Sequence, residues 1–344
     1  MQVKKRFLAR LPWVYAITTL ELEGRTWCLA ASELEGEGGD CLLIDPDTGA
    51  VHTVWTGPGG VMSLVPIPGE AGAFLSIDEF YPVFQSEHAS VHRTVLSFEG
   101  GRLRADKTLL CRLPYTHRIT LLREADGVYL AAASLCERKD FVEDWAHPGG
   151  IYIGAYDPAG VRLEPVYQGL TKHHGMYTQP CPGGDVLWLS AQEGILRVRR
   201  QSGGWNTEFV FREETSDLWL SDLDGDGKEE LAVIQGFHGD TVSILKAGPG
   251  GYEKQVTIPV HFGHVVWSGQ VLGSPSLITA SRAGDMELTL HRVTLQEGHI
   301  QLEPQILDRG SGATQIAVVS EHSRVRIFSA SHETGAVDLY ELTP

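Results

Sequence analysis

Short apolar runs separated by tight turns dominate the chain. Runs rich in Val, Ile, Leu, Tyr and Trp alternate with clusters of Gly, Pro, Asp and Asn, and long segments with a 3.6-residue apolar period are almost absent. This pattern is typical of many short antiparallel strands. We therefore predict an all-β fold.

One hairpin phrase recurs seven times along the chain. Each copy has an apolar strand, a tight turn and a second strand that ends in small residues, as in HRITLLREADGVYLAAAS. The copies span residues 14–32, 61–78, 117–134, 174–191, 217–235, 264–281 and 314–331. They begin about 43 to 57 residues apart, close to the length of a four-stranded propeller blade. The spacing predicts a seven-bladed β-propeller.

Further hairpins between these copies supply the outer strands of six blades. We predict one domain, 1–344, with blades at approximately 11–56, 57–113, 114–170, 171–215, 216–260, 261–310 and 311–344. The last blade lacks an outer strand after residues 336–343. Residues 3–10 are the expected donor, because their pairing would satisfy the backbone groups of an open edge and close the ring.

The composition of the chain argues against nucleic acid and membranes as binding partners. The chain has 344 residues, 42% of them hydrophobic, and a net charge of −16, which repels nucleic acid and anionic membrane surfaces. No apolar run approaches the roughly 18 to 20 residues of a membrane span. Five scattered cysteines without C-x-x-C spacing favour a cytoplasmic protein. We expect no nucleic acid or membrane partner, and a monomer or weak homodimer.

An acidic loop, SDLDGDGKEELAVI at 221–234, predicts a calcium site. An EF-hand is excluded because Val233 stands where its bidentate glutamate belongs and the flanking segments look like strands. Gly225 and Gly227 allow the positive φ angles of a tight loop, and the hard oxygens around them suit Ca²⁺. The expected ligands are five residues of the loop, with a backbone carbonyl from the lysine: Asp222, Asp224, Asp226, Lys228 and Glu230.

This stretch resembles the calcium loops of FG-GAP and VCBS-type repeats, as in the propeller of integrin alpha chains. The resemblance covers about one blade, 216–252, and the Phe-Gly and Gly-Ala-Pro phrases of the family are degraded to GFHGD (236–240) and AGPGG (247–251). It implies a structural calcium ion, on the face opposite the entries to the inner strands. The resemblance does not imply that the protein functions in adhesion as integrins do.

Aligned blades show a second group of candidate ligands. His117, His174 and Asp217 each stand ten residues ahead of a turn glycine, and His264 stands nine ahead of Gly273. Inner strands of a propeller converge on its axis, so these side chains would meet in the central channel. Imidazoles and a carboxylate form a plausible shell for Zn²⁺ or Mn²⁺ with an open position. The competing interpretation is that histidines at loop–strand junctions bind neighbouring blades.

A long, charged and aromatic loop, SLCERKDFVEDWAHPGG at 134–150, would open on the same face as these residues. The expected ligand-binding residues around it are Phe80, Tyr81, Glu137, Trp145, His238 and Arg282. Candidate bases are Lys139, His147 and Tyr177.

Positive and aromatic groups above a histidine-rich channel suit a carbohydrate-like small molecule or oligosaccharide, including a uronic acid. A metal there could assist β-elimination by neutralising the carboxylate. The arrangement resembles propeller-type polysaccharide lyases, such as oligogalacturonate lyases, in architecture and ligand type. Hydrolysis by a carboxylate pair among Glu137, Asp140 and Asp144 is a further option. The alternative class is a non-enzymatic propeller scaffold that binds a protein or glycan, because propellers host many functions.

Overall fold

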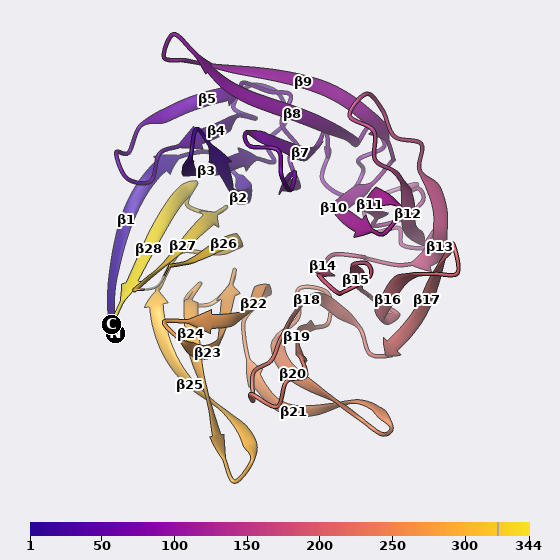
Figure 1. The fold of residues 1–344 in the computed structure, drawn as a ribbon, viewed down its shortest axis with the longest axis vertical. Coiled ribbons are helices and arrows are strands. Elements are labelled where there is room, and N and C mark those ends of the chain that lie inside the picture. The colour runs from indigo at the N-terminus through magenta and orange to yellow at the C-terminus, as the bar shows by residue number, and fades with distance from the viewer. Residues whose placement is uncertain (322) are drawn as a thin grey trace.

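The computed structural model describes residues 1–321 and 323–344, and each regular element in these residues is a β-strand. The strands form seven four-stranded sheets arranged around a central axis (Figure 1). The protein is a seven-bladed β-propeller, which confirms the predicted fold class. No helix long and apolar enough to cross a membrane occurs in the described residues.

The strands are given from the inner to the outer strand of each blade. Blade 1 contains β2 (Val14–Leu22), β3 (Arg25–Ser32), β4 (Cys41–Ile44) and β5 (Val51–Trp55); blade 2 contains β6 (Ser63–Pro66), β7 (Ala73–Asp78), β8 (Ser90–Glu99) and β9 (Arg102–Arg112). Blade 3 contains β10 (Thr116–Glu124), β11 (Gly127–Ser134), β12 (Gly149–Ala155) and β13 (Glu164–Leu170); blade 4 contains β14 (Met176–Gln179), β15 (Val186–Ala191), β16 (Gly194–Gln201) and β17 (Gly204–Phe211). Blade 5 contains β18 (Thr215–Ser221), β19 (Glu230–Gln235), β20 (Thr241–Gly248) and β21 (Gly251–Pro259); blade 6 contains β22 (Gly263–Val271), β23 (Ser274–Ser281), β24 (Leu288–Gln296) and β25 (His299–Asp308). Blade 7 contains β26 (Ala313–Glu321), β27 (Arg324–Ser331), β28 (Ala336–Thr343) and, as its outer strand, β1 (Gln2–Arg10).

The N-terminal strand closes the ring. β1 pairs antiparallel with β28 from Gln2 opposite Thr343 to Arg10 opposite Ala336, and the two termini lie side by side (Figure 1). The predicted donation of an outer strand by residues 3–10 is therefore confirmed.

Apolar side chains hold adjacent blades together face to face. At the closing interface, Phe328 and Leu339 of blade 7 pack with Ile17 and Ala30 of blade 1, and all four are buried. Burial of such faces between sheets is the main favourable contribution to a propeller's stability. Each blade thus depends on both of its neighbours.

A bulge at the start of several inner strands directs side chains into the channel. In five blades the register between the first two strands shifts by one residue, leaving Tyr15, His117, Ser216, His264 and Thr314 without a paired partner. A bulge of this kind re-aims the side chain of the extra residue. Tyr15, His117 and His264 consequently reach one cavity at the channel mouth.

Candidate functional site

A cavity of about 480 Å³ lies at the mouth of the central channel. Its walls are mostly aromatic and apolar, with four imidazoles, one arginine and one glutamate: Tyr15, Glu33, Met62, Phe80, Val83, Phe84, His117, His174, Phe237, His238, Phe262, His264 and Arg282. Sites for small molecules combine apolar walls with a few convergent polar groups in this way. This cavity is the candidate functional site.

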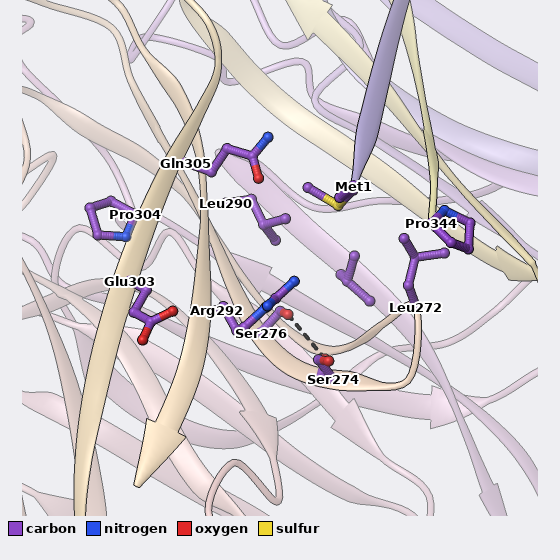
Figure 2. Close-up of a pocket in the computed structure, with 11 residues that line it drawn as sticks. Met1, Leu272, Ser274, Ser276, Leu290, Arg292, Glu303, Pro304, Gln305 and Pro344 are labelled. Carbon is purple, nitrogen blue, oxygen red and sulfur yellow. Dashed lines mark hydrogen bonds between the residues drawn. The ribbon is translucent and has the colours of Figure 1, made fainter. Parts of the chain in front are cut away.

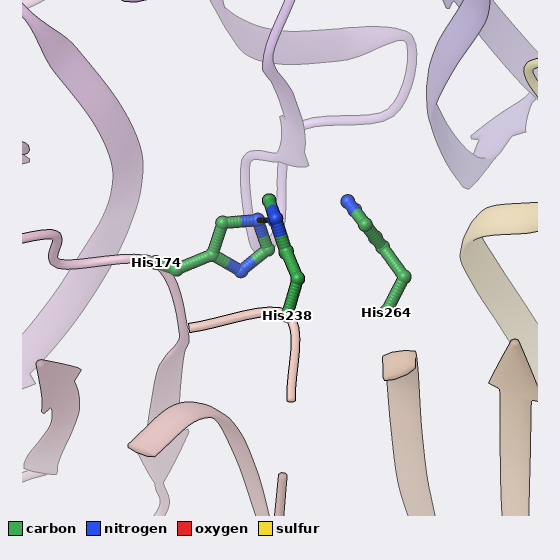
Figure 3. Close-up of side chains that lie close together, drawn as sticks. All are labelled: His174, His238 and His264. Atoms are coloured by element: carbon green, nitrogen blue, oxygen red, sulfur yellow. Dashed lines mark hydrogen bonds between the residues drawn. The ribbon is translucent and has the colours of Figure 1, made fainter. Parts of the chain in front are cut away.

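Three of the imidazoles converge. Ligand nitrogens of His174, His238 and His264 all lie within 4.8 Å of one another (Figure 3). The His174 Nε2 atom is 3.3 Å from His238 Nε2. The rings of His238 and His264 are stacked, with centroids 5.0 Å apart, and the ring of His174 is nearly perpendicular to both. We call these three residues the imidazole group.

A backbone contact orients one member of this group. His264 Nδ1 lies 2.7 Å from the carbonyl oxygen of Thr314. Because a carbonyl only accepts, Nδ1 carries the proton and the Nε2 lone pair faces away from that bond. Metal-binding histidines are commonly held by such an outer hydrogen bond.

The imidazoles are neutral at neutral pH. Burial, reinforced by neighbouring imidazoles and by Arg118, lowers the pKa of His117, His174 and His264 well below the usual range. Burial, and then the charge of Arg282, lowers the pKa of His238 to about 4. Neutral imidazoles keep the lone pairs that a metal ion requires.

His238 enters the group from a loop, residues 236–240, between β19 and β20. Its φ is +50°, a conformation that costs free energy for residues other than glycine and persists where neighbouring contacts enforce it. The rings of Phe237 and Phe262 lie 4.2 and 4.7 Å from its ring. Predicted only as a ligand-binding residue, His238 lies among the candidate metal ligands.

Asp217 lies outside the imidazole group, contrary to the prediction. In blade 5 the bulged residue is Ser216, so Asp217 is one position further along the strand. Its side chain lines a second chamber of about 150 Å³ together with Arg118 and Gln315, and His264 lines both this chamber and the cavity. Burial raises the pKa of Asp217 to about 6, although Arg118 opposes the rise. Counting back from the turn glycine missed this offset because turn length varies between blades.

The long loop of blade 3, residues 135–148, does not present Lys139 to the cavity. The ammonium of Lys139 lies 3.3 Å from the centre of the Trp145 ring and donates a hydrogen bond to the carbonyl of Val142. Burial lowers the pKa of this lysine. Trp145 in turn packs against Phe84 and Phe237. The loop therefore supports the aromatic wall of the cavity from behind.

The other charged residues of this loop also stay outside the cavity lining. Glu137 is exposed, and its N–H donates to the carbonyl of His147. His147 contacts Arg138 at 3.1 Å and lies 3.9 Å from Asp144. The structure gives neither Lys139 nor His147 the position that a base acting in the cavity requires.

Tyr177 and Tyr81 likewise do not line the cavity. Tyr177 lies in β14 with its ring 4.8 Å from that of Trp219, and burial raises its pKa to about 12. Tyr81 is half-buried, whereas the preceding Phe80 lies in the cavity wall, 5.5 Å from the ring of His117. Of the predicted ligand-binding residues, Phe80, His238 and Arg282 reach the cavity directly.

Charged residues from three blades meet at the cavity rim. The Nε atom of Arg282 donates to Glu333 at 3.0 Å, and His332 Nε2 lies 2.6 Å from Glu33. Burial opposes protonation of His332, but its bonds to Glu33 and Glu333 outweigh this effect and raise its pKa to about 9. We call Glu33, Arg282, His332 and Glu333 the rim cluster. It holds the guanidinium of Arg282 at the cavity.

The acidic loop lies at the far end of β18 from the mouth. Oxygens of Asp222, Asp224 and Glu230 lie within 4.8 Å of one another, and both glycines have positive φ, +76° and +84°. The ammonium of Lys246, from β20, contacts Asp224 and lies 2.8 Å from Asp226 and 3.5 Å from Glu230. Lys228 donates its N–H to Asp226 at 2.8 Å. A tethered cation therefore already neutralises much of this loop.

Another cavity, of about 370 Å³, lies between blade 6 and the chain ends (Figure 2). Met1 and Pro344 line it with Leu272, Arg292 and Glu303. None of its lining residues is a histidine. It offers less chemistry than the cavity at the mouth.

Several residues of the cavity wall were not predicted. Tyr15 was missed because counting pointed to Val14, one residue away. Phe84, Phe237 and Phe262 lie in loops between strands, where no repeat pattern applies. Two signals were available: the glycines of GFHGD (236–240) indicate a tight loop around Phe237 and His238, and the aromatic segment 77–84 contains Phe84.

Comparisons with known proteins give a fold but no family. No family model matches the chain, and no curated protein matches it. Among solved structures it is similar to a proposed 6-phosphogluconolactonase from Bacteroides uniformis, with a TM-score of 0.54, 11% identity and 93% of each chain covered. A proposed 6-phosphogluconolactonase from Bacteroides fragilis gives a TM-score of 0.53 and 12% identity, covering 93% of this chain and 92% of that one. The Saccharomyces cerevisiae protein Sqt1 gives a TM-score of 0.58 and 10% identity, with 98% of each chain covered. At such identities these similarities support the propeller fold alone.

Proposed function

We propose that the protein is a metal-dependent enzyme that acts on a small carbohydrate-like acid at the channel mouth. The observation that carries this proposal is the convergence of His174, His238 and His264 in the wall of a cavity that Arg282 also lines. Perturbed imidazoles beside a positive group in a concave pocket are a common sign of a functional site.

The imidazole group fits a transition metal. Zinc–nitrogen bonds of about 2.0–2.1 Å place two nitrogens at neighbouring tetrahedral corners about 3.3 Å apart. His174 Nε2 and His238 Nε2 are separated by 3.3 Å, and His264 already has its Nδ1 held by a carbonyl. Zn²⁺ and Mn²⁺ are suitable ions for this donor set. A metal bound there would neutralise a carboxylate and acidify the adjacent C–H group.

The remaining wall suits a ring that bears an acid group. Arg282 supplies a positive charge, and Phe80, Phe84 and Phe262 supply flat apolar faces on which a sugar ring could stack. Two of the structural neighbours carry the name of a sugar-lactone enzyme, which is compatible with a carbohydrate-like ligand. We infer a uronic acid or a related carboxylated sugar.

β-Elimination from such a ligand requires a base next to the carboxylate. His117 takes this role in our proposal, because it lies in the cavity wall and its ring centroid is 4.7 Å from that of His174. Burial keeps its imidazole neutral, so a lone pair is available to accept a proton. Lys139, His147 and Tyr177 are replaced in this role because they lie outside the cavity lining.

The second candidate is a non-enzymatic scaffold that binds a protein or glycan. It is favoured by the apolar rim, where Val83 and Phe262 line the cavity and remain 37% exposed. Exposed apolar residues grouped around a pocket often mark an interaction surface.

Metal content and product formation separate the two candidates. We expect about one equivalent of a transition metal in the purified parent protein and in His261→Ala, an exposed histidine near His264 that serves as control. His174→Ala should lose that metal. Incubation with polygalacturonate should give an unsaturated, ultraviolet-absorbing product only with metal-loaded protein. Equal metal content in all three proteins would contradict the metal site, and metal binding without product would favour the scaffold.

We also propose that the acidic loop binds a structural calcium ion. The carboxylates of Asp222, Asp224 and Glu230 support this assignment. Glu230 Oε1 is buried and makes no hydrogen bond, and its charged neighbour is the Lys246 ammonium at 3.5 Å. Lys246 would have to move away from these oxygens as the ion enters. Addition of a calcium chelator should lower the melting temperature of calcium-loaded protein; an unchanged melting temperature would contradict the assignment.

A further inference from the structure

Tyr15 lies against the imidazole group. It occupies the bulge of β2, the position that holds His117 in β10 and His264 in β22, and only 4% of its surface is exposed. Its hydroxyl oxygen is 3.3 Å from His174 Nε2 and 3.4 Å from His117 Nε2.

The distances around His174 match a shared shell. His174 Nε2 is 3.3 Å from His238 Nε2 and also 3.3 Å from the hydroxyl oxygen of Tyr15. Ligands about 2.0–2.1 Å from one ion at tetrahedral corners are separated by about 3.3 Å. The oxygen of Tyr15 is therefore spaced from His174 as a neighbouring ligand would be.

Hydrogen bonds alone do not satisfy all the polar atoms of Tyr15, His117 and His174. An imidazole nitrogen carries either one proton or one lone pair, so His174 Nε2 cannot serve His238 and Tyr15 equally well. The Nδ1 atoms of His117 and His174 are buried without a partner, so neither fixes which nitrogen is protonated. Buried polar groups left in this state call for an explanation such as an ion.

We propose that the Tyr15 oxygen is the fourth ligand of the metal held by His174, His238 and His264. This proposal rests on the proposed metal site and names the residue that completes it. The centre would then have three nitrogen donors and one phenolate oxygen, and a substrate carboxylate would bind as a fifth ligand. Binding of the ion would displace the hydroxyl proton, which is released to solvent as for other ligands that deprotonate when they bind a metal.

Copper(II) is a suitable probe, because nitrogen and oxygen sites bind it most tightly among the divalent first-row metals. Metal-free protein is titrated with Cu²⁺ alone, and visible absorption and resonance Raman spectra are recorded. We expect one equivalent to give an intense phenolate-to-copper charge-transfer band with tyrosinate ring vibrations. Tyr15→Phe should still bind one equivalent through the three imidazoles, with lower affinity, and should lose the band completely. Tyr177→Phe, altered at a tyrosine outside the cavity lining, should keep it.

A charge-transfer band that persists in Tyr15→Phe would overturn the proposal, as would a parent Cu²⁺ complex with only weak ligand-field absorption. Parent protein that binds no stoichiometric Cu²⁺, or binding that survives in His174→Ala, would instead overturn the underlying metal site. Circular dichroism of each variant confirms that the propeller is folded, so a lost band reports on the ligand.

Discussion

Replacement of His332 by glutamine is expected to reduce the loss of unfolding free energy that the protein undergoes as the pH rises into the alkaline range. His332 belongs to blade 7, its partner Glu33 to blade 1 and the adjacent Arg282 to blade 6, so the rim cluster ties together the blades where the ring closes. Burial disfavours the charged imidazole, but the bonds to Glu33 and Glu333 raise its pKa to about 9. Protonated His332 therefore stabilises the folded ring.

The sign and size of the effect follow from linkage. The folded pKa lies above the unfolded value of about 6.5, so the contribution is fully present below about pH 6.5 and is lost as pH rises through about 9. If the whole difference between the folded and unfolded pKa of His332 contributed to stability, it would amount to about 3 kcal/mol of unfolding free energy. The side chains of His332 and Glu33 are 16% and 11% exposed, and solvent screening reduces the expected value to about 1–2 kcal/mol.

Urea denaturation followed by tryptophan fluorescence measures this difference. Between about pH 6 and pH 9.5, the free energy of unfolding of the parent should fall by about 1–2 kcal/mol more than that of His332→Gln. His299→Gln, altered at an exposed histidine in the outer strand of blade 6, should behave like the parent. Parallel pH profiles for the parent and His332→Gln would refute the reasoning.

Three other substitutions test separate parts of the structure. Lys246→Gln removes the tethered ammonium from the acidic loop and should strengthen calcium binding by about tenfold or more in calorimetric titration, since a competing charge is lost; unchanged binding would show that the lysine does not compete. Phe328→Ala empties a fully buried site in the closing interface and should cost about 3–5 kcal/mol of unfolding free energy, whereas Phe7→Ala at a 58% exposed position should cost under about 0.5 kcal/mol. Lys139→Met removes the cation over Trp145 and should speed proteolysis within residues 135–148 while the metal content stays constant; unchanged cleavage would mean that this contact does not hold the loop.

The propeller could be predicted because its signals are local and repeated. Each hairpin carries its own turn residues and apolar alternation, and the spacing of the copies fixes the number of blades. Ring closure followed from counting strands, since 336–343 required an outer neighbour and 3–10 was the spare segment. Pairing of β1 with β28 agrees with that count.

The site was only partly predictable, because three of the cavity residues, Tyr15, His117 and His264, are placed by bulges that the sequence does not mark. The predicted position differs by one residue from the bulge in two blades. Asp217 was predicted where Ser216 occupies the bulge, and Val14 where Tyr15 does. His117, His174 and His264 do line the cavity. Their distances to the turn glycine are ten, ten and nine residues, whereas the bulge residues Ser216 and Tyr15 stand eleven and nine residues ahead of theirs, so a fixed count of ten misses both.

Loop side chains were the least predictable. The charges of residues 134–150 suggested that Lys139 and His147 face the ligand. Packing reverses that expectation, because the Trp145 ring attracts the ammonium of Lys139 and buries it behind the aromatic wall. Such contacts join residues of the loop to Phe84 and Phe237 from other blades, so they depend on the assembled ring.

X-ray absorption spectroscopy at the zinc edge, on protein loaded with one equivalent of Zn²⁺, tests the central claim most directly. The account predicts nitrogen or oxygen neighbours at about 2.0–2.1 Å and the outer-shell scattering of three imidazoles, reduced to two in His264→Ala. A spectrum dominated by carboxylate oxygens, or one unchanged in His264→Ala, would contradict a metal centre at the channel mouth.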